Sequence, residues 1–225
     1  MTEEEYLAQY DAAAFERPSV AVDVVLFTIL EDRLQVLLTR RDAHPFRDCP
    51  ALPGVFVGVE ESLEEAAMRA LREKAGLQGI YLEQLYTGGD VARDPRMRIL
   101  SVSYYALVPA ASLAVSGEGT WLCPVDEIEK DAGLAFDHAR IIAYGRERIR
   151  NKVNWSDIAF SLLPEEFTLP QLQRVYEILL DQPLYKANFR KKIADKIVET
   201  EKMITGNAHR PSRIYRKRSG TETDQ

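Results

Sequence analysis

A short stretch of the chain, residues 69–77, reads RALREKAGL, and its Gly76 suits the end of a helix. Positions 73 and 74 lie three and four residues after position 70, so both neighbour it on one face of the predicted helix. Such a face could carry a row of metal-binding carboxylates, but here it holds Ala70, Glu73 and Lys74. One carboxylate beside an ammonium group is a poor magnesium site. The stretch therefore predicts a helix that is poorly suited to bind a metal ion, and no cofactor is expected to be required.

A second group of residues suits phosphate recognition. The segment GGDVARDPRMRIL, residues 88–100, forms a predicted loop before a strand and contains Arg93, Arg96 and Arg98. Guanidinium groups stay charged and bind phosphate oxygens with paired hydrogen bonds. Arg40 and Arg41 end another predicted strand and could face the same cleft, with Phe46 beneath a planar ring such as adenine. The alternative for each of these arginines, taken singly, is an ordinary surface charge.

Asp137 and His138, in the sequence FDHA, have side chains that could transfer protons. They stand at the start of a predicted helix that runs from about residue 136 to about residue 150. We therefore favour a capping and packing role for this pair over acid–base catalysis.

The C-terminal part of the chain has a pattern typical of nucleic-acid binding. In the segment LYKANFRKKIADKI, Phe189, Ile193 and Ile197 recur at helical spacing and predict a buried stripe. The remaining surface of this helix suits phosphates and base edges through Lys186, Asn188, Arg190, Lys191 and Lys192. Two short predicted strands follow around the sequence TGNAHRP, and they carry Arg210, Arg213, Arg216, Lys217 and Arg218. Helix, break, basic helix and basic hairpin indicate a winged helix-turn-helix, with a solvated basic face as the alternative.

The elements that would position these residues divide the chain in two. Residues 19–29 and 34–41 predict a β-hairpin, residues 62–76 a capped helix, and residues 80–87 and 99–108 two further strands. Strands with intervening helices indicate an α/β layered domain over residues 1–150. Residues 151–218 are predicted to form the winged helix-turn-helix domain, and the polar residues 219–225 a disordered tail.

Composition supports this division. The net charge of −6 combines about −9 in residues 1–150 with about +3 in residues 151–225. An acidic body with a basic C-terminal region indicates two functions on one chain. Two cysteines without zinc-type spacing, no secretory signal and no long apolar run indicate a cytoplasmic protein that does not span a membrane.

The segment LPGVFVGVEESLEEAAMRALREKAGL, residues 52–77, resembles the Nudix box, the signature of a family that hydrolyses nucleoside diphosphates linked to other groups. The positions that match the box are Glu61, Arg69, Leu71, Glu73, Gly76 and Leu77, and those that depart from it are Val55, Ala70 and Lys74. The resemblance implies an α/β/α sandwich with a mixed sheet. In the family, glutamates at the positions of Ala70 and Lys74 hold divalent cations, so their replacement predicts a protein that is not an enzyme.

Loss of the metal need not abolish ligand binding. Lys74 could neutralise a pyrophosphate beside Glu61 and Glu73 without activating water. The alternative is that Lys74 is solvated and pairs with Glu73 or another nearby carboxylate.

The order of the two domains resembles that of the Nudix-related transcriptional regulators of NAD metabolism. The similarity extends to YLEQLYTGGDVARDPR, to the run from AFDHARIIAY to QLQRVYE, and to RPSRIYR. It implies a homodimeric repressor of NAD synthesis or salvage genes that binds a palindromic operator in double-stranded DNA. It also implies a nucleotide effector, ADP-ribose or a relative, although related regulators sense sugars. The rival predictions are an active Nudix hydrolase and a nucleotide sensor whose C-terminal domain binds protein.

Overall fold

The computed structural model describes residues 1–113, 119–128, 133–204 and 212–218. Strand β1 (Ser19–Leu30) is at the centre of the N-terminal domain. Its alternating side chains face two separate apolar clusters, with Val24 and Leu26 in one and Val25 and Phe27 in the other. A strand buried on both faces reads as a continuous apolar run, as this one does. β1 is therefore the middle layer of the sandwich.

The sheet around β1 is mixed. β1 pairs in parallel with β6 (Ile99–Leu107) and antiparallel with β2 (Arg33–Arg40), as the hairpin predicted from the sequence requires. The strand order is β3-β2-β1-β6-β5, with β3 at Pro50–Ala51 and β5 at Glu83–Gly88. Two further strands pair off this path, β4 (Gly54–Phe56) with β1 and β7 (Thr120–Pro124) with β2.

Helix α2 (Leu63–Ala75) covers one face of the sheet. It begins with the predicted capping box of Ser62 and Glu65 and ends at Gly76, whose φ of 67° is left-handed. Its buried side is built mostly from alanines, which let the helix backbone approach the sheet closely.

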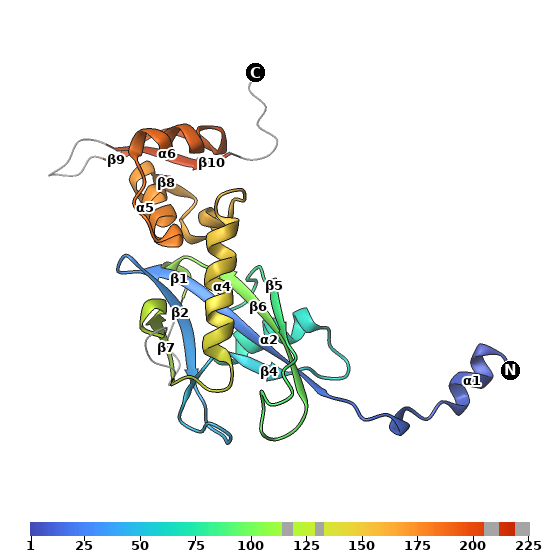
Figure 1. Ribbon diagram of the computed structural model, residues 1–225. Coiled ribbons are helices and arrows are strands. Elements are labelled where there is room, and N and C mark those ends of the chain that lie inside the picture. The colour runs from blue at the N-terminus through green and yellow to red at the C-terminus, as the bar shows by residue number, and fades with distance from the viewer. Residues whose placement is uncertain (114–118, 129–132, 205–211, 219–225) are drawn as a thin grey trace.

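Helix α4 (His138–Lys152) crosses the opposite face and continues into the C-terminal domain (Figure 1). Gly145 lies against Phe27 of β1, because a Cβ atom there would stand 2.9 Å from the Phe27 ring. The short helix α3 (Val125–Ile128) follows β7. These elements confirm the α/β/α sandwich with a mixed sheet, and α4 begins and ends two residues later than the sequence predicts.

The C-terminal elements form a winged helix. A 3₁₀ segment at Ile158–Leu162 leads into β8 (Glu166–Thr168), α5 (Leu169–Leu180), α6 (Lys186–Ile193), β9 (Ile197–Ile204) and β10 (Ser212–Lys217). The three strands form a small sheet in the order β8-β10-β9. The predicted stripe of Phe189, Ile193 and Ile197 is buried, although α6 stops at Ile193 and continues as a 3₁₀ turn over Ala194–Lys196. The hairpin tip and residues 219–225 lie outside the described residues.

One apolar cluster joins the two domains. It runs from Phe27 of β1 through Ile142 and Ile149 of α4 to Leu172 of α5 and Ile193 of α6. The expected boundary at residue 150 thus falls in the last turn of a helix that packs in both domains.

The N-terminal segment, with α1 (Glu3–Gln9) and a 3₁₀ turn at Ala12–Ala14, projects away from the two domains (Figure 1). Another 3₁₀ turn follows β6, at Ala110–Ser112. Among the described residues, no helix is both long and apolar enough to cross a membrane.

Candidate ligand pocket and nucleic-acid interface

A charged residue stands in the middle of the central apolar strand. Asp23 is 6% exposed, and its carboxylate accepts a hydrogen bond from the Ser101 hydroxyl at 2.5 Å. Arg93 Nη2 lies 3.4 Å from its Oδ2, and His138 Nε2 lies 3.5 Å from its Oδ1. Burial raises the pKa of Asp23, but His138, Ser101 and Arg93 outweigh that effect and lower the pKa to about 2. Asp23 is therefore ionised and fully surrounded by donors.

Arg93, which comes from the loop before β6, is almost completely enclosed. Its side chain is 5% exposed and donates to Asp137 at 2.6 and 3.3 Å and to Asp23 at 3.4 Å. Burial acts to lower the pKa of Arg93, and the bonds to Asp137 and the charge of Asp23 raise it above its usual value. Two carboxylates already compensate this guanidinium, so its main role is to join the loop to β1 and to the start of α4.

His138 completes the network. Its Nδ1 accepts from the backbone N–H of Leu52 at 2.9 Å, so the proton is on Nε2, which faces Asp23. The packing role expected for His138 is confirmed, since it is 3% exposed. The capping role expected for Asp137 is wrong, because its side chain makes no cap hydrogen bond and binds Arg93 instead.

A cavity of 140 Å³ lies above this network. It is lined by Ala21, Asp23, Arg41, Leu52, Gly54, Val55, Phe56, Arg93, Asp94, Arg96, Ile99, Phe136 and His138. Three of the arginines predicted to bind phosphate therefore do line one cavity. Phe46, the predicted aromatic partner, packs edge-on against Phe136 with ring centroids 4.8 Å apart.

Two cations of the cavity differ in how their charge is compensated. Arg96 forms a bidentate pair with Asp94, at 2.8 and 3.0 Å. Arg41 donates to the backbone carbonyls of Pro45 and Ala43, and its guanidinium carbon lies 4.7 Å from the centre of the Phe136 ring. Burial, and then repulsion from Arg96, lower the pKa of Arg41 below its usual value. An anion between these two guanidinium groups would relieve that repulsion.

The loops that hold the aromatic rings have unusual backbone conformations. Phe46, Asp48 and Phe136 have φ values of 61°, 65° and 52°, in the left-handed region that residues other than glycine seldom adopt. Such conformations cost about 1–3 kcal/mol each and gather at ligand sites. Phe46 and Phe136, whose rings contact each other beside the cavity, are two of these three residues.

The remaining predicted ligand residues do not line the cavity. Glu61 instead pairs with Arg69 at 2.6 Å and accepts from the backbone N–H of Gly58 at 2.7 Å. The Arg69 hydrogen bond is the main reason that the pKa of Glu61 falls to about 2. Arg40 is exposed, and Arg98 donates to the backbone carbonyl of Gly89.

The sequence predicted that positions 70, 73 and 74 share one face of α2, and this prediction is wrong for position 70. Ala70 is fully buried in the cluster between α2 and the sheet, whereas Glu73 and Lys74 are exposed. Glu73 lies 3.6 Å from Arg69, one turn earlier on the helix. In the part of the chain that the structure describes, no three His, Cys, Asp or Glu residues are grouped so that they could hold a metal.

Several lining residues escaped prediction from sequence. Asp23 had a visible signal, because a lone carboxylate in the run SVAVDVVLF must find partners if the strand is central. Phe56 and Phe136 gave no such signal, since each lies in a segment without regular periodicity. Only the fold brings these rings together with Arg41 and Arg96.

Helix α6 presents the predicted DNA-contacting side chains in two groups. Lys186, Asn188, Arg190 and Lys191 are all exposed. Lys192 is also exposed, but its Nζ donates to Asn154 at 2.8 Å and lies 5.5 Å from the centre of the Tyr176 ring. The side chains of the first group make no hydrogen bond or ion pair to another residue in the described part of the chain, so they are the ones most readily available to a DNA groove.

The hairpin after α6 shows a similar division. Arg213 pairs with Glu199 across the two strands, and Lys217 pairs with Asp157 at 2.9 Å. Arg216 and Arg218 also lie on the described part of the hairpin, and both have partners. Arg210 lies outside the described residues.

Both halves of the chain match known protein families. Residues 19–144 match the NUDIX domain, and residues 159–217 match the NrtR DNA-binding winged helix domain. A relative from Acinetobacter baylyi, named an ADPR responsive transcriptional repressor, is 34% identical over 222 residues, covering 96% of this chain and 88% of the relative.

Two solved structures from Shewanella oneidensis extend the comparison. The crystal structure of its NrtR complexed with a 27mer DNA has a TM-score of 0.80 and 36% identity, covering 88% of this chain and 93% of that one. The structure of its NUDIX domain with ADP ribose has a TM-score of 0.59 and 40% identity, covering 66% of this chain and 99% of that one.

Proposed function

The chain belongs to the NrtR family of Nudix-related transcriptional regulators, and on that premise we propose that it is an ADP-ribose-responsive repressor of NAD biosynthesis or salvage genes. The N-terminal domain binds the nucleotide without hydrolysing it. The winged helix binds double-stranded DNA. The protein acts as a homodimer, because two copies of α6 match the two halves of a palindromic operator.

The observation that carries the proposal for the effector is the Arg41–Arg96 pair in the cavity. Arg96 already has a carboxylate partner, whereas the hydrogen bonds of Arg41 go to backbone carbonyls. A pyrophosphate supplies the anion that Arg41 lacks, and the Phe136 and Phe56 rings offer flat apolar surfaces to a base or sugar.

Ligand binding requires a rearrangement at the cavity. A volume of 140 Å³ is below the roughly 300–1,000 Å³ typical of small-molecule sites. The Arg41 guanidinium lies on the Phe136 ring, where a planar base would otherwise stack. We propose that Arg41 leaves this ring for the phosphates and that the loop around Phe46 opens with it.

Isothermal titration of ADP-ribose tests this function, with NAD and a simple sugar as competing candidates. Arg41→Ala removes the cation and is expected to weaken binding roughly ten- to hundredfold, the range of a charge-assisted hydrogen bond. Arg40→Ala is the matched control, because Arg40 is the exposed neighbour on the same strand. Equal affinities for the two variants would place the ligand elsewhere.

DNA binding is tested by gel shift on promoters of NAD genes. The logarithm of affinity should fall linearly as the logarithm of salt concentration rises, since phosphate contacts release counterions. A response that is flat with salt would favour a C-terminal domain that binds protein instead.

Hydrolysis is the remaining rival, and Glu61 and Glu73 of the box favour it. Incubation with ADP-ribose and Mg²⁺ should leave the ligand intact. The two replaced positions explain why: Ala70 offers no oxygen ligand, and Lys74 places a cation where a metal would bind. Release of AMP at an enzymatic rate would reverse this part of the proposal.

A further inference from the structure

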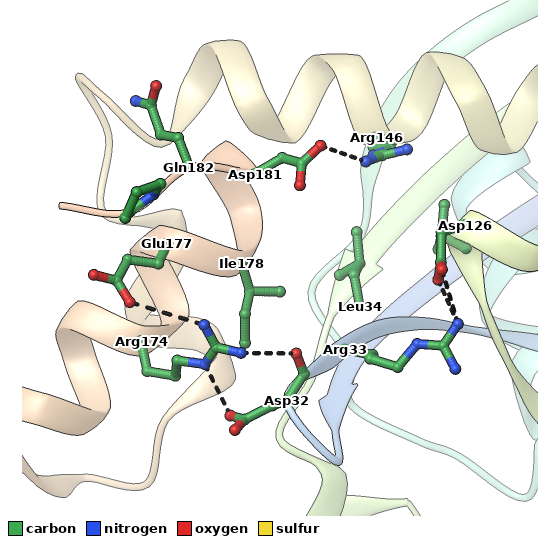
Figure 2. A pocket seen from close by; sticks show the side chains of 12 residues that line it. Asp32, Arg33, Leu34, Asp126, Arg146, Arg174, Glu177, Ile178, Asp181 and Gln182 are labelled. Atoms are coloured by element: carbon green, nitrogen blue, oxygen red, sulfur yellow. Dashed lines mark hydrogen bonds and ion pairs between the residues drawn. The ribbon is translucent and has the colours of Figure 1, made fainter.

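A larger cleft, of 660 Å³, lies between the two domains (Figure 2). Its walls are the β1–β2 turn, the start of α3, the middle of α4 and the second half of α5. The residues that line it are Asp32, Arg33, Leu34, Val125, Asp126, Arg146, Arg174, Glu177, Ile178, Asp181, Gln182 and Pro183. The cleft is separate from the ligand cavity and shares no lining residue with it.

One ion pair crosses this cleft from α5 to the sheet. Arg174 Nε donates to Asp32 Oδ1 at 3.0 Å, and its Nη2 donates to the Asp32 backbone carbonyl at 3.4 Å (Figure 2). Glu177, one turn later, lies 3.8 Å from Nη1 of the same guanidinium. Asp32 is fixed by a tight turn in which it and Glu31 have left-handed φ values of 58° and 52°. Arg174 therefore links α5 to the β1–β2 turn.

A second set of contacts joins α5 to α4. Arg146 Nη2 lies 3.2 Å from a carboxylate oxygen of Asp181, the residue that ends α5 with a φ of 55°. Arg150 donates to the carbonyl of Leu180 from Nε at 3.1 Å and from Nη2 at 2.9 Å. These contacts fix the end of α5 immediately before the break that leads to α6.

The two elements that hold α5 also reach the ligand cavity. β1 carries Asp23 of the cavity and ends at the turn that contains Asp32. α4 begins at His138, another cavity residue, and carries Arg146 two turns later. Two rigid elements thus connect the cavity to the helix that precedes the DNA-contacting helix.

We propose that the Arg174–Asp32 and Arg146–Asp181 pairs are positioning contacts through which the occupancy of the ligand cavity sets the orientation of α6. The inference rests on the proposed function, because it requires a ligand that changes DNA affinity. Asp32 and Asp181 are 70% and 64% exposed, so the pairs add little to global stability. Coupling between two sites needs only a small difference between states, typically about 5- to 150-fold in affinity.

The quantity to measure is the coupling factor, the ratio of DNA dissociation constants with saturating ADP-ribose and without it. Arg174→Met keeps the aliphatic stem and removes the ion pair, and it is expected to bring the factor about two- to fivefold closer to one, the range of an exposed pair. The exchanged pair, Asp32→Arg with Arg174→Asp, should restore most of the lost coupling. Arg146→Met tests the α4 contact in the same way.

Arg33→Met is the matched control. Arg33 lines the same cleft and pairs with Asp126 at 2.8 Å and Glu127 at 2.9 Å, but all three residues belong to the N-terminal domain. Its removal should leave the coupling factor at the wild-type value. Thermal melting of every variant checks that the fold is intact.

The outcomes separate this inference from the function on which it rests. A wild-type protein whose DNA affinity does not respond to ADP-ribose overturns the proposed function. A responsive wild type with an unchanged factor in Arg174→Met and Arg146→Met overturns the positioning role alone. An equal loss in Arg33→Met would also overturn it, since the effect would then come from the charge of the cleft.

Discussion

Arg93 and Lys191 are both cations that the sequence predicts to contact phosphate, and the structure gives them opposite surroundings. Arg93 is enclosed between Asp23 and Asp137, with 5% of its side chain exposed. Lys191 projects from α6 into solvent. A buried cation is compensated by the protein and holds the fold, whereas an exposed one is available to a ligand. The position of the charge relative to the core decides which role it has.

The largest effect is expected from removing Arg93, the buried cation of this comparison. Arg93→Leu leaves Asp23 and Asp137 without their shared cation, which should cost about 3–5 kcal/mol of unfolding free energy. Urea denaturation measures this loss. Arg40→Ala, an exposed arginine of the same domain, should change stability by less than about 0.5 kcal/mol.

A small effect of Arg93→Leu, similar to that of the control, would contradict the comparison. It would mean that solvent reaches Asp23 and that the network is not a closed structural unit.

The dependence of the unfolding free energy on pH in the acidic range tests the same network through the Asp23 carboxylate. The pKa of Asp23 is lowered from 3.8 to about 2 in the folded protein, so this group stabilises the fold fully above about pH 4. The contribution, about 2 kcal/mol, is lost as the pH falls from about 4 to about 2. Asp23→Asn should flatten this part of the curve of unfolding free energy against pH. If the variant keeps the full acid limb, other carboxylates account for it.

Two neighbouring lysines on α6, Lys191 and Lys192, test the prediction that an exposed cation contacts DNA phosphate. Lys191→Ala should reduce the slope of log affinity against log salt by about one for each α6 bound, because one phosphate contact is lost. Lys192→Ala should leave the slope nearly unchanged, since its ammonium group contacts Asn154 and Tyr176. Equal effects from the two variants would show that Lys192 turns outward on DNA.

The smallest effect is expected at Lys74. It is exposed on α2 and does not line the cavity, so Lys74→Ala should change the affinity for ADP-ribose less than twofold, or about 0.4 kcal/mol at most. Titration beside Arg41→Ala makes the comparison direct. A large loss at Lys74 would mean that the bound ligand extends from the cavity to α2.

Local patterns predicted most of the fold. The apolar run of β1, the capping box at Ser62 and the buried stripe of α6 each depend on residues close together in the chain. The candidate site was less predictable. Its lining comes from β1, the residues that follow β2 and β3, β4, the loop before β6 and the start of α4, which are up to 117 residues apart.

By itself, the sequence determined that residues 52–77 resemble a Nudix box with Ala70 and Lys74 at two positions that depart from it, and that a segment with the pattern of a basic winged helix follows. These are properties of residue type and spacing, which need no tertiary contact. Only the tertiary structure decided that Ala70 packs in the core, that Arg93 is compensated by two carboxylates and that Arg41 is held by carbonyl oxygens. Burial and the charge of distant neighbours set those roles, because electrostatic energy depends on distance in space and on exclusion of water.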